Sequence, residues 1–302
     1  MNGADNARWV RPLGSASAEG WEVAITDAVE GWAHTSLYAA SLAEGESRKV
    51  QPGEWEHLVV PLSGSVTVRV GGDEVVQLAG RTSVFAGSTD VAYVARDLGF
   101  TVTASGGPVR VAVCGAKARA RHTPAVRHVT REEVPVELRG AGVASREVRN
   151  FGTPEVLGAD ALIACEVVTP AGNWSSWPPH KHDEERPGVE SELEEIYYFE
   201  VQPAHGAAEG ADPIGYQRVY GTGERPIDVL AEVRSGDVVL VPHGWHGPAM
   251  AAPGYDLYYL NVMAGPGSER AWLICDDPAH GWVRGTWPTM AVDPRLPVGG
   301  AR

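Results

Sequence analysis

Two histidines separated by one residue, His180 and His182, are the strongest chemical signal in this sequence. In a strand, residues i and i+2 point to the same face, so both imidazoles can reach one ion. A carboxylate at the start of the next strand-like run, in the pair Glu194-Glu195, adds an oxygen ligand. A mixed nitrogen and oxygen set of this kind suits a divalent first-row metal.

A third imidazole follows a later apolar run. The stretch 237–246 is typical of an apolar strand followed by a turn at Pro242 and Gly244 and then a histidine. His246 is favoured as the ligand because it follows this turn, and His243 is the competing choice. Three histidines and one carboxylate therefore predict a metal site in the second half of the chain.

Short strand-like runs must position these residues, because β-branched segments bounded by turn residues dominate both halves and helical periodicity is scarce. The pair Gly71-Gly72 between two such runs is typical of a tight hairpin. Many short strands with frequent turns favour a sandwich or barrel in each half. The runs are Leu58–Leu62, Ser65–Val70, Val75–Leu78, Val91–Val94, Phe100–Ala104 and Val109–Cys114 in the first half, and Ala161–Thr169, Ile196–Val201, Gln217–Tyr220, Val229–Val233, Asp237–Val241 and Tyr255–Val262 in the second.

The pattern predicts two barrels joined by a linker. Residues 1–115 form the first barrel, residues 116–150 the linker, and residues 151–302 the second barrel with a C-terminal tail. The linker opens with a basic stretch from Lys117 to Arg127. We interpret it as solvated surface, and a basic segment that binds a partner is the alternative.

The charge balance separates the two halves. The chain has 302 residues with 25 Lys or Arg and 39 Asp or Glu, a net charge of −14, of which −13 belongs to residues 151–302. This balance disfavours nucleic acid as a partner. No apolar run approaches the roughly 20 residues of a membrane span, and the first residues lack a signal-peptide pattern. The three cysteines form neither a disulfide framework nor a CxxC site. A soluble cytoplasmic protein is expected.

Several stretches resemble the 5-deoxy-glucuronate isomerases of myo-inositol catabolism: GNWSSWPPHKHD (172–183), LEEIYYF (193–199), VPHGWHGP (241–248), YYLNVMAGP (258–266) and DDPAHGWVR (276–284). These enzymes are bicupins related to the 4-deoxy-5-hexosulose-uronate ketol-isomerases of pectin breakdown. The resemblance implies an all-β fold of two tandem cupin (jelly-roll) barrels. It places the metal ligands at His180, His182, Glu195 and His246. Glu195 is preferred to Glu194 because the alignment anchors on the Ile-Tyr-Tyr strand that follows.

Two departures from the general cupin pattern fit this branch of the family. The second motif (236–246, GDVVLVPHGWH) is one residue short, and the insertion 183–194 separates the second histidine from the glutamate. This insertion is a candidate lid over the site. In the first half, the residues from Glu56-His57 onward resemble a first cupin motif, but no further histidines lie near them. The first barrel is therefore expected to be structural and metal-free.

The resemblance implies an aldose–ketose isomerisation that converts 5-deoxy-glucuronate to 5-dehydro-2-deoxy-gluconate. A divalent metal (Zn, Mn, Fe or Ni) with open positions would hold two substrate oxygens as an enediolate forms. An anionic sugar acid also needs a cation, for which we predict Arg218, with Arg284 as the second choice. Tyr197, which shares a strand face with Glu195, and Tyr259 are predicted to contact the substrate.

Other interpretations stay open from the sequence. The catalytic base is unassigned: Asp183, Glu184 and Glu190 are candidates, and a solvated acidic loop is the alternative. Trp174 and Trp177 either stack on a sugar or pack at the barrel mouth. An isomerase of a related deoxy-hexosulose-uronate and a cupin dioxygenase are alternative functions, and the intact ligand set disfavours a storage protein. Exposed sheet edges predict a homo-oligomer. The expected ligand is a small sugar acid, and neither nucleic acid nor a membrane is expected as a partner.

Overall fold

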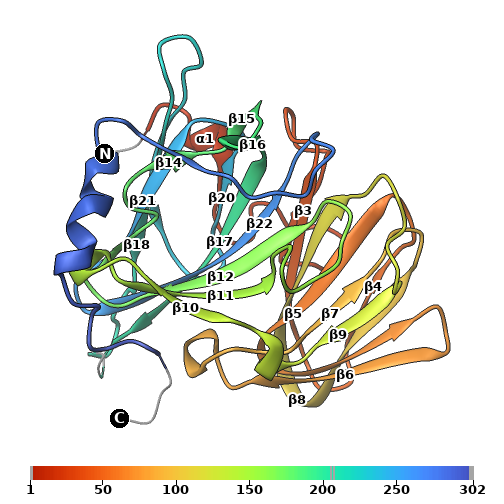
Figure 1. The fold of residues 1–302 in the computed structure, drawn as a ribbon. Helices are drawn as coiled ribbons and strands as arrows, with labels where there is room; N and C mark the ends of the chain where they lie inside the picture. Colours follow the sequence, from red (N-terminus) through yellow and green to blue (C-terminus); the bar gives the residue numbers. More distant parts are fainter. Residues whose placement is uncertain (1–2, 205, 207, 299–302) are drawn as a thin grey trace.

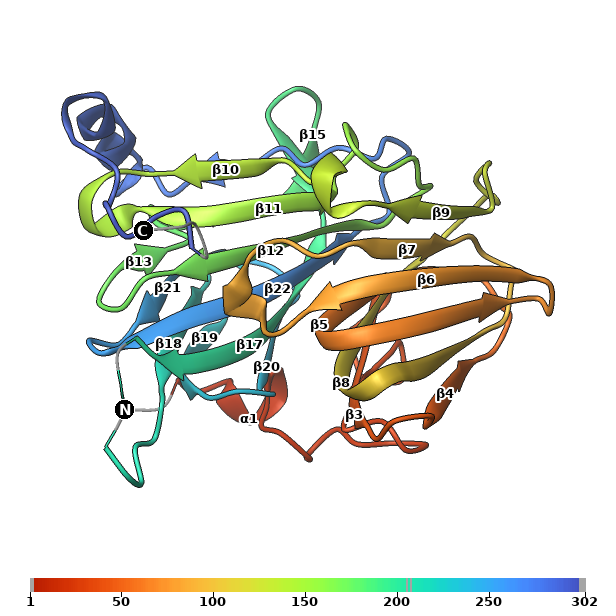
Figure 2. The same cartoon turned by 90° about the horizontal axis from the view of Figure 1, so that it is seen from below.

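The computed structural model describes residues 3–204, 206 and 208–298, which form two β-barrels packed against each other (Figures 1 and 2). The first barrel is an eight-stranded sheet. The long strands β5 and β8 pair with each other, β5 also pairs with β7 near its start and with β6 near its end, and β8 also pairs with β4 near its start and with β3 near its end. The strands are β2 (Val23–Ile25), β3 (Thr35–Leu42), β4 (Ser47–Val50), β5 (Trp55–Val70), β6 (Glu74–Arg81), β7 (Val91–Val94), β8 (Phe100–Lys117) and β9 (Val126–Val129).

The second barrel consists of two facing antiparallel sheets and a hairpin at its rim (Figure 1). One sheet holds, in spatial order, β1 (Val10–Arg11), β20 (Val238–Val241), β17 (Glu194–Pro203), β22 (Tyr255–Ala264), β12 (Ile163–Thr169), β11 (Arg146–Gly152) and β10 (Val136–Arg139). The other holds β19 (Asp228–Val233), β18 (Gly215–Tyr220), β21 (Trp245–Ala251), β14 (His180–Lys181) and β23 (Cys275–Asp276), with β13 (Trp174–Ser175) paired to β21. The hairpin is β15 (Asp183–Arg186) and β16 (Glu190–Glu192).

Helices are few and short in the described part of the chain. None of them has the length and apolar composition that a membrane span requires. They are α1 (Asn6–Trp9) and the 3₁₀ helices η1 (Val84–Ala86), η2 (Arg131–Glu133), η3 (Gly142–Ala144) and η4 (Gly281–Thr289).

The predicted boundaries between the barrels differ from the structure in two places. The segment 116–150, expected to be a linker, supplies edge strands to both barrels, because β9 pairs with β7 and β10 pairs with β11. The N-terminal segment crosses to the other barrel, where β1 pairs with β20. Edge strands of both barrels therefore gain backbone hydrogen-bond partners from segments that were expected to lie outside them.

Apolar side chains fill the interior of the first barrel. A buried cluster that includes Val59, Val68, Phe100 and Val111 occupies this space. His57 is on the same face of β5 as Val59, and its ring centroid is 5.4 Å from that of Phe100 with an angle of 67° between the two ring planes. Burial lowers the pKa of His57 to about 4, so this imidazole is neutral at physiological pH.

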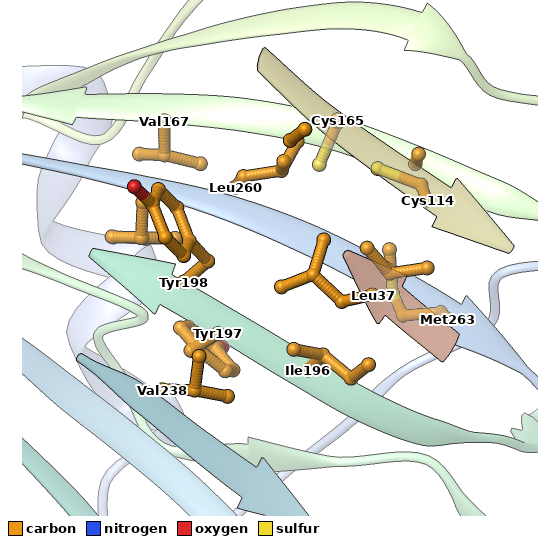
Figure 3. Close-up of a cluster of buried hydrophobic side chains, with 14 of the residues drawn as sticks. Leu37, Cys114, Cys165, Val167, Ile196, Tyr197, Tyr198, Val238, Leu260 and Met263 are labelled. Carbon is orange, nitrogen blue, oxygen red and sulfur yellow. The ribbon is translucent and has the colours of Figure 1, made fainter. Parts of the chain in front are cut away.

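The two barrels share a continuous apolar core. Leu37 and Cys114 of the first barrel belong to the same buried cluster as Cys165, Ile196 and Met263 of the second (Figure 3). Burial of this much apolar surface holds the two barrels in a fixed relation.

A buried ion cluster also joins the barrels. Arg81 of the first barrel donates two hydrogen bonds of 2.6 Å to Glu166 of the second, and Arg149 donates a third at 2.8 Å. Burial alone would raise the pKa of Glu166, but the two guanidinium groups lower it overall. The carboxylate is therefore ionised and paired.

Candidate metal centre

Strand pairing decides which side chains face the interior of the second barrel. Glu195, Tyr197 and Phe199 alternate onto one face of β17. Tyr197 lies opposite Asn261 and Phe199 lies opposite Tyr259 on β22, and directly paired residues share a face of the sheet. Tyr259 and Asn261 therefore belong to the face that carries Glu195.

His182, Glu195 and His246 form a compact buried group whose nearest ligand atoms all lie within 4.8 Å of one another. The Nε2 atoms of both histidines are 3.1 Å from Oε2 of Glu195. His246 enters the group from the opposite sheet, since it is paired with His180 across β14 and β21. The structure thus brings together three of the four predicted ligands.

His180 lies beside this group. Its ring centroid is 4.5 Å from that of His246 and 6.3 Å from that of His182, and its side chain is buried. Burial lowers the pKa of His180 well below its ordinary value, and the two neighbouring histidines lower it further. A neutral imidazole is the form that binds a metal.

The three imidazoles are oriented alike. The Nδ1 atoms of His180, His182 and His246 lie 3.1–3.3 Å from the backbone carbonyls of Pro178, Leu193 and Gly244 respectively. A hydrogen bond from Nδ1 to a carbonyl fixes the tautomer and leaves Nε2 free to bind a metal. Nε2 of His246 is buried, and although it lies 3.1 Å from Oε2 of Glu195, it forms no aligned hydrogen bond with any described residue. This donor set fits a divalent metal ion.

Burial and close contact shift the pKa values of Glu195 and His182 in opposite directions. Burial would raise the pKa of Glu195, but His182 and His246 lower it to about 2. Burial would lower the pKa of His182, but its hydrogen bond with Glu195 raises it overall. An ionised carboxylate therefore lies among three imidazoles in a site from which bulk water is excluded.

The adjacent Glu194 binds the first barrel, so only one carboxylate of the pair reaches the site. Its carboxylate accepts hydrogen bonds from the backbone N–H groups of Ala33, His34 and Thr35 in the first barrel, at 3.1, 2.7 and 2.6 Å. Successive strand residues point to opposite faces, so Glu194 faces the other barrel while Glu195 faces the interior.

Arg218 does not point into the barrel, contrary to the sequence-based prediction. On β18, Gln217 and Val219 are fully buried, so the alternating Arg218 faces outward. There it forms an ion pair with Asp228 and donates to the carbonyl of Val229 at 2.9 Å. The prediction failed because residue type alone does not determine which residues of a strand face the barrel interior.

The other sequence candidates are engaged elsewhere. Arg284 donates two hydrogen bonds to Asp276, at 2.5 and 2.7 Å. His243 is half-buried and outside the ligand group. Asp183 and Glu190, candidates for the base, both bind Lys181, at 2.6 and 2.8 Å. These carboxylates hold the β15–β16 hairpin together instead of entering the group.

A cluster of hydroxyl groups lies next to the histidines. Ser176 Oγ is 3.1 Å from the hydroxyl of Tyr197 and 3.3 Å from that of Tyr259. The ring of Tyr197 is 6.2 Å from that of His246. Ser176 has a φ of 48°, a left-handed backbone conformation that is unusual for a residue with a side chain. Tyr197 and Tyr259 are therefore together on the inner face, as substrate contact would require.

Sequence reasoning missed three residues of this interior. Ser176 was hidden in a Trp-rich loop. Gln217 is fully buried with both amide atoms unpaired among the described residues, and the alternation along β18 was the signal that could have found it. Arg146 is buried on β11, inside the segment that was expected to be a linker.

Comparisons with known proteins agree with this architecture. Residues 9–283 match the model of the KduI/IolB family. The chain is 41% identical to the 5-deoxy-glucuronate isomerase of Geobacillus kaustophilus over 92% of this chain and 95% of that one, and 38% identical to the enzyme of the same name from Bacillus subtilis over 80% and 84%.

Solved structures extend the likeness to the fold. An IolB-like protein from Salmonella typhimurium superposes with a TM-score of 0.81 at 33% identity, covering 91% of this chain and 99% of that one. The oxalate decarboxylase of Lactobacillus farciminis superposes with a TM-score of 0.60 at 10% identity over 89% and 88%, which is a likeness of fold alone. The predicted all-β bicupin fold and the predicted family resemblance are confirmed.

Proposed function

Because the chain belongs to the KduI/IolB family, we propose that it is a metal-dependent aldose–ketose isomerase that converts 5-deoxy-glucuronate to 5-dehydro-2-deoxy-gluconate. The observation that carries the metal dependence is the buried His182–Glu195–His246 group, in which Nε2 of His246 lies 3.1 Å from the Glu195 carboxylate without an aligned hydrogen bond to any described residue. Relatives that are 36–41% identical share the name 5-deoxy-glucuronate isomerase, which supports the substrate.

The ligand set that we propose is His180, His182, Glu195 and His246. Three imidazoles, each with its Nδ1 directed at a backbone carbonyl, and one carboxylate accept zinc, manganese, iron or nickel. An ion held by these residues would supply positive charge for substrate oxygens on which negative charge develops as a proton moves between adjacent carbons.

The chain's own hydroxyl groups complete the proposed site. Burial raises the pKa of both Tyr197 and Tyr259, so both phenols stay protonated and can donate hydrogen bonds at neutral pH. Ser176 lies within hydrogen-bonding distance of both hydroxyls and orients them. Donors held in fixed positions stabilise charge that develops on substrate oxygens. We assign Tyr197 and Tyr259 to substrate binding on this basis.

An assay that follows product and oxygen together tests the proposed reaction. The purified protein is incubated with 5-deoxy-glucuronate, while proton NMR follows the sugar and an oxygen electrode follows the solution. We expect the aldehyde signal to disappear as the ketose appears, without oxygen uptake. Oxygen uptake that matches substrate loss would favour a dioxygenase. Turnover of 4-deoxy-5-hexosulose-uronate alone would favour the related isomerase.

A further inference from the structure

Arg146 carries a buried guanidinium that has no carboxylate partner in the described part of the chain. The residue is 4% exposed, and burial lowers its pKa to about 10, so it is charged at neutral pH. Among the Lys and Arg residues described between 139 and 298, only Arg146 and Arg270 form no ion pair. Arg270 is satisfied, because three of its nitrogens donate to backbone carbonyls at 2.5–2.7 Å.

The hydrogen bonds of Arg146 leave one edge of its guanidinium unused. Nη1 donates to the carbonyls of Ala144 and Trp177, at 3.0 and 3.4 Å. Nε and Nη2 have no acceptor among the described residues. These two nitrogens form the edge that binds a carboxylate through two parallel hydrogen bonds.

Strand pairing places Arg146 on the inner face of the second barrel. Val148 of β11 lies opposite Val167, and Val167 lies opposite Tyr259, which shares its face with Glu195. Arg146 precedes Val148 by two residues and therefore points to the same side. The Trp177 carbonyl that Arg146 contacts belongs to the segment leading to His180.

The charged residues near Arg146 do not supply a free negative charge to balance its guanidinium. Arg284, whose positive charge lowers the pKa of both Arg146 and His180, is already paired with Asp276. Arg139, on the same face of the sheet, is paired with Glu137. A buried charge without a counter-charge is strongly destabilising, and an anionic ligand would supply the missing charge.

We propose that Arg146 binds the carboxylate of the substrate, an inference that rests on the proposed function and deepens it. In 5-deoxy-glucuronate the reacting carbons are C1 and C2, and the carboxylate is C6 at the other end of the chain. When the oxygens of C1 and C2 face His182, Glu195 and His246, the carboxylate points away from them. Arg146 is the buried cation on this inner face whose bidentate edge has no protein acceptor among the described residues.

A binding measurement tests this role apart from catalysis. The probe is the acid obtained by reducing the substrate aldehyde to an alcohol, which cannot isomerise. Calorimetry compares wild type, Arg146→Met, Arg146→Lys and the matched control Arg218→Met, whose guanidinium lies on the outer surface. We expect Arg146→Met to weaken binding about 10- to 100-fold, the size of a lost charged hydrogen bond. Arg146→Lys should recover part of the affinity, and Arg218→Met should match wild type.

Stability and kinetics separate this role from a merely structural one. Removing an unpaired buried charge should leave the Tm of Arg146→Met equal to or above that of wild type, with metal content unchanged. The KM for 5-deoxy-glucuronate should rise, whereas a neutral analogue with a primary alcohol in place of the carboxylate should be turned over equally by both proteins. If Arg146→Met does not fold, the same comparison of charged and neutral sugars is made with Arg146→Lys and wild type.

Two outcomes would overturn the inference. One is wild-type affinity for the reduced acid in Arg146→Met, and the other is an equal loss of activity on the charged and neutral sugars. The proposed function fails separately: a wild-type protein that binds the acid through Arg146 but does not isomerise the substrate would refute the isomerase and keep the anion site.

Discussion

The single most informative residue-scale contrast is between Glu195 and His57, which hold equivalent places in the two barrels. Each is the second residue of an adjacent pair at the start of a long central strand, and each faces its barrel interior. In the second barrel, Glu195 is surrounded by imidazoles, whereas His57 contacts Phe100 within an apolar interior. The same backbone position thus gives a polar site in one barrel and packing in the other.

The pKa of His57 predicts an effect on stability. Its folded pKa of about 4 lies below the ordinary value of 6.5, so the unfolded chain takes up the proton first as pH falls. The stability that neutral His57 preserves is fully present above pH 6.5 and is lost progressively as the pH falls toward 4. Between pH 7 and pH 5, wild type should lose about 2 kcal/mol more unfolding free energy than His57→Gln, measured by urea titration. Equal losses in both proteins would contradict a buried neutral His57.

At the scale of elements, two glutamates at the starts of β5 and β17 fasten each barrel to the other. Glu56 accepts hydrogen bonds from the backbone N–H groups of 160–162 in the second barrel, at 2.7–2.9 Å. Glu194 does the same for 33–35 in the first. The arrangement is reciprocal, as expected for two barrels built on the same strand plan.

This arrangement separates the effects of substituting the adjacent glutamates. Glu194→Gln should lower the free energy of unfolding by about 3 kcal/mol, because a neutral amide replaces a charged acceptor of several hydrogen bonds, and it should keep the metal. Glu195→Gln should lose the metal with a smaller effect on the folding of the metal-free chain. The exposed neighbour provides the control Glu192→Gln. Metal loss in Glu194→Gln with unchanged stability would refute the assignment.

Sequence patterns could predict the strands and most of the ligands, because both depend on local spacing. His180 and His182 share a strand face by periodicity alone, and a later turn leads to His246. Arg218 was chosen wrongly because its parity depends on which side of β18 packs inward. Arg146 was missed because β11 is buried on both faces, so it lacks the alternation that marks a strand. The pairing of β1 with β20 joins residues more than 220 positions apart, and no local signal reports it.

At the scale of the whole molecule, one barrel supports the chemistry of the other. The apolar interior of the first barrel, the shared core and the Arg81–Glu166 pair give the second barrel a rigid base. The second barrel can then keep in its interior polar atoms that have no partner among the described residues, such as the Gln217 amide and the Nε and Nη2 atoms of Arg146. Buried polar groups of this kind reduce stability and are typical of functional sites. The predicted homo-oligomer stays a prediction, which light scattering would test.

The central claim is that one metal ion bound by the His–Glu–His group supports isomerisation. The most direct measurement is the metal content of wild type and of the His182→Ala/His246→Ala double variant, with turnover of 5-deoxy-glucuronate measured on the same samples. We predict about one divalent metal per chain in wild type, and loss of both metal and turnover in a variant that still folds. Full turnover by a metal-free wild-type protein, or by the double variant, would contradict the account.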